Sequence, residues 1–425
     1  MKQFLAIIIL LVVLLQACSP TPITEEIVEI VFYKRGYVEG GEDSATLAIV
    51  NAVKAFESRN PSIRVKVVGI SYGLDGDTIL DEALKNREDV HVTSIYPAKL
   101  PEYGRAGYLS PIDDYLTAED RADFYESALQ AASVDGKIYA WPLWVTAVAM
   151  YANPQIFAER GVEIPTLDDP WTWAEFVAAA EKLTYQKEDG TQVYGFSASS
   201  KPGVVVYLPF FYIDGGRALS PDGRRFVQNE LPAVTALQKV ADLHLVHKVT
   251  PPDFGNVDQT GIRAQFEAGT LAIAMETPSF IPDMQAKNVA FVPFPVPTGD
   301  LGLTVTSGAF GMYSVITNPD PQKVTAAHLF AKYLTSAEVA GDVPNYQLAP
   351  GLRRSNSAYA TDDARAIISR LVSFGVFEPP VSIPNELNEK YQIALQSILL
   401  GEKTAQEAMN NIAPEYQQAL DNLSP

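Results

Sequence analysis

Five consecutive residues, Gly69-Ile70-Ser71-Tyr72-Gly73, match the Gly-x-Ser-x-Gly pattern that surrounds the nucleophilic serine of many hydrolases. That chemistry needs a sharp strand-to-helix turn and a histidine base that follows an acidic residue later in the chain. The next residues, Leu-Asp-Gly-Asp, form a loosely turning stretch, and the histidines stand in no telling context: His91, His244, His247 and His328. We interpret the glycines as easing a strand-end loop beside Ser71 and Tyr72, and a secreted serine hydrolase using Ser71 remains an alternative.

Metal and acid–base chemistry have weaker candidates. His244-x-x-His247 can place two imidazoles on one helix face, but a zinc site requires further ligands nearby. Two pairs of carboxylates are candidates for acid–base chemistry. Asp113-Asp114 resembles the start of a helix or turn, and Asp168-Asp169 resembles a loop before a proline, so general acid–base catalysis is a minor alternative. No Gly-x-Gly-x-x-Gly or Walker-type run is present, so nucleotide chemistry lacks its usual motif. We predict no enzyme activity, no metal and no cofactor.

Four tryptophans fall within 33 positions and point instead to binding. Trp173 begins an amphipathic helical pattern after Thr172, so we expect it to be a core residue. Trp144 lies in the run Trp-Pro-Leu-Trp-Val-Thr-Ala, which is too irregular for a helical stripe. Aromatic faces stack on the C–H faces of sugar rings and on cations, so Trp144 is the better candidate for a ligand contact.

The elements that must position these residues alternate between strand and helix patterns. Strands are predicted at 29–33, 63–70 and 90–94, with helices at 45–58 and 77–86 between them and a helical turn at 101–109. This order predicts a mainly parallel sheet, whose ligands lie beyond the carboxyl ends of its strands. A second α/β region follows, with strands near 194–197, 272–276 and 290–294, helices near 231–247 and 261–268, and a helical end from residue 364.

Composition excludes several classes of protein. The chain has 425 residues, of which 47% are apolar, and 51 acidic side chains outnumber 32 basic ones, giving a formal net charge of −19. This length predicts two or three domains. The negative charge argues against nucleic acid and against electrostatic attachment to an anionic bilayer.

The N-terminus predicts export. Residues 1–17 combine Lys2, an apolar stretch from Phe4 to Leu15 and a small residue, Ala17, which describes a signal peptide rather than a spanning helix. Leu-Gln-Ala-Cys at 15–18 resembles the bacterial lipoprotein signal, so we predict that Cys18, the sole cysteine, is lipidated. An ordinary signal peptide with a free thiol is the alternative. Residues 18–26 are prolyl and polar, as expected of a tether.

A series of short motifs, in this order and spacing, covers nearly the whole mature chain. It comprises Val50–Val68 with Asn60-Pro61 inside it, Ala106–Leu116, Asp135–Pro142, Tyr151–Asn153, Thr172–Phe176, Phe266–Ala272, Phe294–Pro297 and Ala327–Ser336. Together these segments resemble the extracellular solute-binding proteins of bacterial ABC importers, in the group that includes maltose- and oligosaccharide-binding lipoproteins.

The resemblance implies an α/β, two-lobed, periplasmic-binding-protein-like fold of the class II type, whose lobes are joined by crossing hinge segments. Carried over to this chain, the crossings fall near 145–148, 304–308 and 336–341. The expected organisation is a signal peptide at 1–17, a tether at 18–26, a first lobe at 27–145 and 306–336, and a second lobe at 146–305 and 337–425.

The same resemblance projects ligand-binding positions onto strand ends and crossings. They are Tyr33, Lys34, Arg35, Tyr72, Ser94, Tyr96, Trp144, Thr146, Glu276, Ser279, Ser307, Gly308, Tyr346 and Arg353. Where sugar binders often carry a tryptophan just beyond Glu276, this chain has Thr-Pro-Ser-Phe at 277–280, and Phe280 is the residue expected to substitute.

The function implied is that of an extracytoplasmic receptor that binds a carbohydrate or polyol and delivers it to the transmembrane subunits of an ABC importer. Another small polar metabolite, such as a phosphate ester or an amino compound, is the alternative ligand, and a structural surface lipoprotein is an alternative role. We expect a monomer, anchored by lipid to the outer face of the cell membrane, or on the periplasmic side where the envelope has two membranes.

Overall fold

The structure is a computed structural model that describes residues 27–71, 74–200, 206–343, 346, 349–355, 359, 362–379, 381 and 383–423. The predicted signal peptide, Cys18, the tether and Tyr72 therefore lie outside the described residues. Within the described ranges, no helix combines the length and the apolar character needed to cross a membrane.

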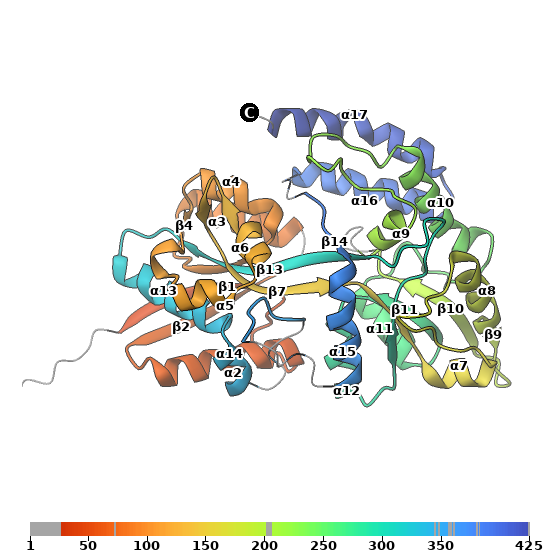
Figure 1. Ribbon diagram of the computed structural model, residues 1–425, viewed down its shortest axis with the longest axis horizontal. Coiled ribbons are helices and arrows are strands. Elements are labelled where there is room, and N and C mark those ends of the chain that lie inside the picture. Colours follow the sequence, from red (N-terminus) through yellow and green to blue (C-terminus); the bar gives the residue numbers. More distant parts are fainter. Residues whose placement is uncertain are drawn as a thin grey trace, which may run out of the picture.

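The first lobe is built on a mixed sheet, at the left of Figure 1, with strand order β14-β13-β3-β1-β2 and with β4 and β7 paired to β13. β1 pairs in parallel with β2 and β3, while β13 is antiparallel to β3. Both faces of β1 are covered, since Ile30, Val31 and Phe32 are all buried, as is typical of parallel strands. The strands are β1 (Val28–Arg35), β2 (Ile63–Ile70), β3 (Val92–Ile95), β4 (Leu109–Ser110) and the hairpin of β5 (Ser133–Val134) and β6 (Lys137–Ile138).

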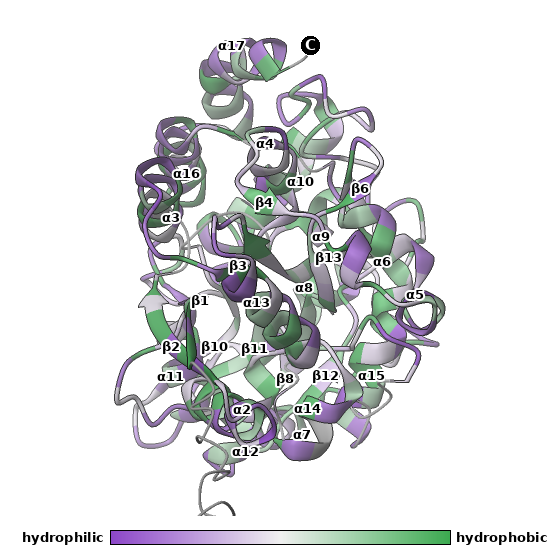
Figure 2. Ribbon diagram, turned by 90° about the vertical axis from the view of Figure 1, so that its left-hand side faces the viewer, coloured by the Kyte–Doolittle hydropathy of each residue, from purple (hydrophilic) through white to green (hydrophobic). Residues whose placement is uncertain are grey.

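Helices cover this sheet. In α2 (Ser44–Arg59), Asp43 caps the first turn by accepting a hydrogen bond from Thr46 N, and Ile49, Val53 and Phe56 form the buried stripe. The other helices are α3 (Leu74–Asn86), α4 (Leu100–Arg105), α5 (Ala118–Asp123), α6 (Glu126–Ala131), α13 (Pro321–Leu334) and α14 (Ala337–Asp342), with short 3-10 turns at Pro97–Lys99 and Asp113–Tyr115. In Figure 2, outer helices such as α3 and α5 carry the hydrophilic residues, while hydrophobic residues gather on strands of the interior.

The second lobe contains a sheet of order β12-β8-β11-β10-β9. Alternation along β8 separates two cores, because Met150 and Ala152 face one hydrophobic cluster and Ala149 and Tyr151 face the other. Its strands are β8 (Ala149–Ala152), β9 (Tyr185–Gln186), β10 (Gln192–Ala198), β11 (Leu271–Glu276) and β12 (Val292–Phe294). Its helices are α7 (Pro154–Arg160), α8 (Trp173–Leu183), α9 (Leu208–Tyr212), α10 (Leu231–Leu245), α11 (Gln259–Glu267), α12 (Phe280–Ala286), α15 (Asp363–Leu371), α16 (Asn385–Leu399) and α17 (Ala405–Leu423).

Two antiparallel strands, β7 (Trp141–Ala147) and β13 (Thr306–Ile316), run between the lobes (Figure 1). β7 continues directly into β8 of the second lobe, and the start of β13 pairs with β14 (Gly375–Val376), which follows a 3-10 turn at Val372–Phe374. The expected crossings at 145–148 and 304–308 overlap the end of β7 and the start of β13. The expected boundary at 336/337 falls between α13 and α14, and residues on both sides of it, including Leu334, Val339 and Val343, pack in the core of the first lobe.

The predicted α/β class and the order of strands and helices are confirmed. The strand predicted at 63–70 has the bounds of β2, and the helices predicted at 45–58 and 231–247 correspond to α2 and α10. The helical turn predicted at 101–109 ends early, because α4 stops at Arg105 and Leu109 belongs to β4. The predicted helical end is interrupted by β14, whose pairing partner β13 is distant in sequence.

Candidate functional site

Six of the predicted ligand residues lie on the two crossing strands, on β3 beside β13, or on β11 of the second-lobe sheet. Trp144 and Thr146 of β7 lie opposite Gly311 and Ala309 of β13. Ser94 of β3 lies opposite Tyr313 at the other edge of β13, and Glu276 of β11 lies opposite Ala149 of β8. Ser307 and Gly308 belong to β13 itself, where Val148 N donates a hydrogen bond to Ser307 O at 3.2 Å. Ser94, Trp144, Thr146, Ser307 and Gly308 therefore share the first-lobe sheet, while Glu276 belongs to the second-lobe sheet.

The indole of Trp144 rests on a glycine. A Cβ placed on Gly311 would lie only 2.3 Å from the Trp144 ring, so a larger residue cannot occupy that position without a shift. On its other edge, β7 meets Gly351 in an isolated bridge at Trp144. Trp144 remains half-buried in this arrangement. One side of the indole is thus supported by the crossing strand while part of the side chain stays accessible for stacking.

Three of these residues carry buried polar atoms without a hydrogen-bond partner among the described residues. They are Ser94 Oγ, Thr146 Oγ1 and Glu276 Oε1. Leaving such an atom unpaired costs about 1–3 kcal/mol, so native proteins rarely do so without a reason. Two hydroxyls in the first-lobe sheet and one carboxylate oxygen in the second-lobe sheet are groups that can hydrogen-bond to the hydroxyl groups of a ligand.

Only one carboxylate oxygen of Glu276 accepts hydrogen bonds from the described residues. Its Oε2 accepts hydrogen bonds from Gln259 Nε2 at 2.7 Å and from Thr277 N at 3.1 Å, and lies 3.5 Å from Arg263 Nη2. Arg263 also donates to Ser279 Oγ at 2.7 Å, which places the predicted Ser279 in the same cluster. Burial raises the pKa of the Glu276 carboxyl above its usual range, although Arg263 and Gln259 oppose that shift.

The carboxyl end of β1 brings together four more predicted residues. Arg35 is buried, forms an ion pair with Asp77 at 2.5 Å, and lies 4.7 Å from the ring centre of Tyr96, which is exposed. Lys34 Nζ donates to Arg35 O at 2.8 Å, and burial, together with the charge of Arg35, lowers the pKa of Lys34 to about 8. Tyr33 is half-buried, with its hydroxyl 3.4 Å from Glu88 Oε2.

Three aromatic or charged residues that the sequence analysis proposed as ligand contacts instead contact other residues within a single lobe. Tyr346 is buried in the core of the first lobe, with its hydroxyl 3.4 Å from that of Tyr313. Arg353 is 5% exposed and is bonded to Asp120 and Asp123 of the first lobe. Phe280, expected to replace a tryptophan, is fully buried against Tyr151 in the second lobe.

Sequence reasoning missed an aromatic pair at the crossing. Phe377, 40% exposed, stacks on Phe310 of β13 with ring centres 4.6 Å apart and an interplanar angle of 14°. The Phe377 ring also covers Gly308, where a Cβ would lie 2.3 Å from it. The next residue, Glu378, accepts hydrogen bonds from the backbone N–H groups of 218 and 219 in the second lobe. The pattern Gly-x-x-Gly at 308–311 was the available signal that rings pack on β13.

Two surface hollows lie elsewhere on the first lobe. One, of about 490 Å³, is bordered by α5, α6 and the β5–β6 hairpin, with Arg121, Glu126 and Arg354 in its lining. The other, of about 360 Å³, lies between the starts of β1 and β2 and α13, and is lined by Val28, Ile63 and Leu329 among others. Neither is lined by a predicted ligand residue, so the candidate site rests on the unpaired polar atoms and on Trp144.

The hydrolase alternative requires a histidine partner for Ser71. Ser71 follows β2 directly and α3 begins at Leu74, so the strand and the helix of the motif are present. The histidines, however, are bonded to other residues: His91 to Val31 N, His244 to Thr250, His247 to Glu181 and His328 to Ser110. None of these bonds involves Ser71.

Comparisons with known proteins agree with the fold. A putative binding protein of Brucella abortus is 24% identical over 262 residues, 60% of this chain, and the match spans only 61% of that relative's length. The multiple sugar-binding protein of Streptococcus mutans is 25% identical over 347 residues, 78% of each chain. Among solved structures, an ABC substrate-binding protein of Listeria monocytogenes in complex with cycloalternan has a TM-score of 0.80 at 21% identity, covering 93% of this chain and 100% of that one.

These similarities extend across both lobes. The TM-score confirms the predicted two-lobed architecture, because the whole of the Listeria chain is covered. The family model described as bacterial extracellular solute-binding protein matches residues 41–341, from the segment before α2 into the last turn of α14. Since that match takes in well over half of the sequence, the chain belongs to the bacterial extracellular solute-binding protein family.

Proposed function

We propose that this protein is the extracytoplasmic receptor of an ABC importer and that it binds a carbohydrate or polyol between its two lobes. The observation that carries the proposal is the set of buried oxygens on Ser94, Thr146 and Glu276 that have no hydrogen-bond partner among the described residues, together with the half-buried Trp144 on the strand that holds Thr146. A polyhydroxyl ligand supplies donors and acceptors for such oxygens, and the C–H face of a sugar ring stacks on an indole.

The mechanism is binding without chemistry. The lobes can adopt an open and a closed arrangement, and a ligand that contacts both lobes stabilises the closed one. The ligand shifts the equilibrium between the two arrangements only to the extent that it binds one of them more tightly than the other. In this structure the lobes touch through Thr78 Oγ1 and Asn385 Nδ2, 3.2 Å apart, and through contacts between α2 and α12. We infer that ligand favours an arrangement in which the two lobes close on it, which the transmembrane subunits of the importer then recognise.

Export and anchoring complete the proposal. The sequence at 1–18 supports cleavage and lipidation at Cys18, followed by a tether at 18–26. The predicted location is the outer face of the cell membrane, or the periplasmic side in a two-membrane envelope. The receptor acts as a monomer, and the remaining predicted ligand residues other than Arg353 stay part of this proposal.

An anionic ligand is the second candidate, because of Lys34. Among the described residues Lys34 forms no ion pair with a carboxylate, although it lies beside the buried Arg35–Asp77 pair. A phosphate ester would supply the missing negative charge. An amino compound would instead be drawn to Glu276 Oε1.

A thermal-unfolding screen tests the proposed function. We would heat the purified chain with a panel of sugars, polyols, amino compounds and phosphate esters. A ligand at 100 times its dissociation constant adds roughly 2.7 kcal/mol to the free energy of unfolding. Stabilisation by a sugar or polyol, with the compound recovered unchanged, is the expected result. A flat response across the panel, or consumption of the compound, would count against a receptor of this class.

A further inference from the structure

The segment Ala349–Ser355 forms an additional strand-like neighbour of β7, on the edge that does not face β13. Val145 N donates to Pro350 O at 3.0 Å, Leu352 N donates to Leu143 O at 3.2 Å, and Gly351 bridges Trp144. Trp144 is therefore flanked by Gly311 on one side and Gly351 on the other. Gly311 lies against the indole ring, whereas Gly351 pairs with the backbone of Trp144.

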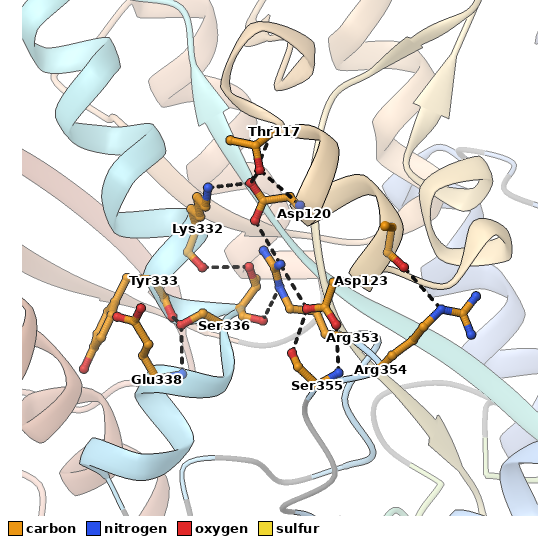
Figure 3. Close-up of polar contacts among 12 residues, drawn as sticks. Thr117, Asp120, Asp123, Lys332, Tyr333, Ser336, Glu338, Arg353, Arg354 and Ser355 are labelled. Carbon is orange, nitrogen blue, oxygen red and sulfur yellow. Dashed lines mark hydrogen bonds and ion pairs between the residues drawn. The ribbon is translucent and has the colours of Figure 1, made fainter.

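Arg353 fixes this segment to the first lobe (Figure 3). Its Nε donates to Thr335 O at 2.9 Å, and its Nη1 donates to Asp120 Oδ1 at 3.1 Å and lies 3.4 Å from Asp123 Oδ2. The guanidinium also stacks over the Phe124 ring, with its carbon 3.9 Å from the ring centre. The planar fork of arginine suits such multiple contacts, which lysine cannot all reproduce.

The residues next to Arg353 extend the same anchor. Asp123 accepts hydrogen bonds from Ser355 N at 2.8 Å and Ser355 Oγ at 2.7 Å, and Tyr125 N donates to Leu352 O at 3.2 Å. Asp120 in turn accepts a hydrogen bond from Lys332 Nζ at 2.5 Å, which ties α5 to α13 (Figure 3). These hydrogen bonds thus attach the segment from 350 to 355 to the first lobe.

We propose that Arg353 is a positioning residue of the ligand site: by holding Gly351 against β7 it sets the Trp144 indole, and so controls ligand affinity without touching the ligand. The proposal rests on the proposed function, since it takes Trp144 to be a ligand contact. Arg353 Nη2 is buried and has no partner among the described residues, so a direct ligand contact is the competing role.

The first arm of the test needs no ligand. We would compare Arg353→Met, Arg353→Lys and the milder Asp123→Asn, and obtain the Trp144 component of fluorescence by subtracting the spectrum of the same variant carrying Trp144→Phe. Acrylamide quenching of that component should rise at least twofold in Arg353→Met, rise less in Arg353→Lys, and rise slightly in Asp123→Asn. The matched control is Arg354→Met, because Arg354 is exposed and stacks on Tyr125, and it should leave quenching unchanged.

The second arm measures the dissociation constant for a compound found in the thermal screen. Arg353→Met should weaken binding about tenfold, and should weaken it no further once Trp144→Phe is present, because both changes act through one indole. If Arg353 contacts the ligand, the two losses will add and the ligand-free Trp144 component will be unchanged, which would overturn the proposal. A quenching change without any change in affinity would overturn it too.

Failure of the two proposals can be told apart. If no compound in the screen binds the wild-type chain, the proposed function fails, while the fluorescence of the ligand-free variants still decides whether Arg353 sets the indole. Asp123→Asn keeps the buried guanidinium of Arg353, so this variant provides the test if Arg353→Met does not fold. An unchanged Trp144 component in a folded Asp123→Asn variant would then contradict the proposal.

Discussion

The face of the Trp144 indole lies against the α-carbon of Gly311. A Cβ built on Gly311 is 2.3, 2.5 and 2.6 Å from three adjoining ring atoms, Cε2, Cζ2 and Cδ2, so it would stand over the ring rather than beside its edge. Gly311 does not have a positive φ, so its backbone suits alanine and the obstacle is steric. The absence of a side chain at 311 is what lets the indole lie on the crossing strand.

We therefore expect Gly311→Ala to displace the indole. Overpacking of this kind costs about 1–3 kcal/mol of unfolding free energy, and ligand affinity should fall about tenfold or more. In a Trp144→Ala background the same change should cost little, because the clash partner is gone. Chemical denaturation and ligand titration of the four members of this cycle measure both effects. Equal costs in the two backgrounds would mean that Gly311 and Trp144 are not coupled.

Thr146 permits a prediction in which stability and binding move in opposite directions. Its buried Oγ1 has no partner among the described residues, so Thr146→Val should raise the free energy of unfolding of the ligand-free chain by about 1 kcal/mol. If a ligand hydroxyl pairs with that oxygen, the same variant should bind about tenfold more weakly. Denaturant unfolding and ligand titration check the two signs.

The matched control is Thr306→Val on the neighbouring crossing strand. Thr306 is fully buried and its Oγ1 donates to Val148 O at 2.6 Å, so this hydroxyl is already satisfied. Its removal should lower the free energy of unfolding by about 1 kcal/mol. A stabilised Thr306→Val, or a destabilised Thr146→Val, would show that the hydrogen-bond assignment at the crossing is wrong.

Local patterns predicted the elements but not the contacts that make the site. The buried apolar run of β1 and the amphipathic stripe of α2 are local signals, and both elements were predicted from the sequence. β13 gave no such signal, because Gly308 and Gly311 interrupt it and its pairing with β7 joins residues far apart in the chain. The choice of Trp144 over Trp173 relied on an irregular run, which proved to be a strand buried along most of its length.

Charged residues show the same limit. Arg353 pairs with Asp120, 233 positions earlier, and Arg35 pairs with Asp77, 42 positions later. Nothing near either arginine in the sequence marks its partner, since an exposed arginine and a buried, paired one can have the same neighbours. That Ser94 Oγ, Thr146 Oγ1 and Glu276 Oε1 have no hydrogen-bond partner among the described residues is likewise visible only in the three-dimensional structure.

The lowered pKa of Lys34 predicts that the free energy of unfolding rises in mildly alkaline solution. Burial and the charge of Arg35 lower its pKa in the folded chain to about 8, while an unfolded lysine has a pKa of about 10.4. Between these values the unfolded chain binds more protons than the folded one, so the free energy of unfolding should increase with pH from about 8 to about 10. The increase should be smaller in Lys34→Met, and urea unfolding at several pH values measures it.

The same titration separates the two ligand classes. Affinity for an uncharged sugar or polyol should change less than about twofold between pH 7 and pH 9, whereas a phosphate ester held by Lys34 would bind progressively more weakly as the ammonium loses its proton near pH 8. We expect the first result. A loss of affinity centred near pH 8 that disappears in Lys34→Met would instead favour the anionic ligand.

The lowered pKa of Asp120 predicts that the free energy of unfolding falls in acidic solution. Burial raises the pKa of its carboxyl, but hydrogen bonds from Lys332, Thr117 and Arg353 outweigh burial and hold that pKa below the usual range. A lowered carboxyl pKa contributes stability above about pH 4, the unfolded value, and this contribution disappears as the pH falls through the folded value. The free energy of unfolding should therefore drop below about pH 4, and less steeply in Asp120→Asn.

At pH 7, Asp120→Asn should itself cost about 3 kcal/mol, because it leaves the 5% exposed guanidinium of Arg353 without its nearest carboxylate. Asp135→Asn is the control, since Asp135 forms an exposed ion pair with Arg105 and should change stability little. Urea unfolding from pH 3 to pH 7 measures all three chains. If Asp120→Asn were as harmless as Asp135→Asn, the Arg353 anchor would contribute nothing to the first lobe, and the position of Gly351 beside Trp144 would need another cause.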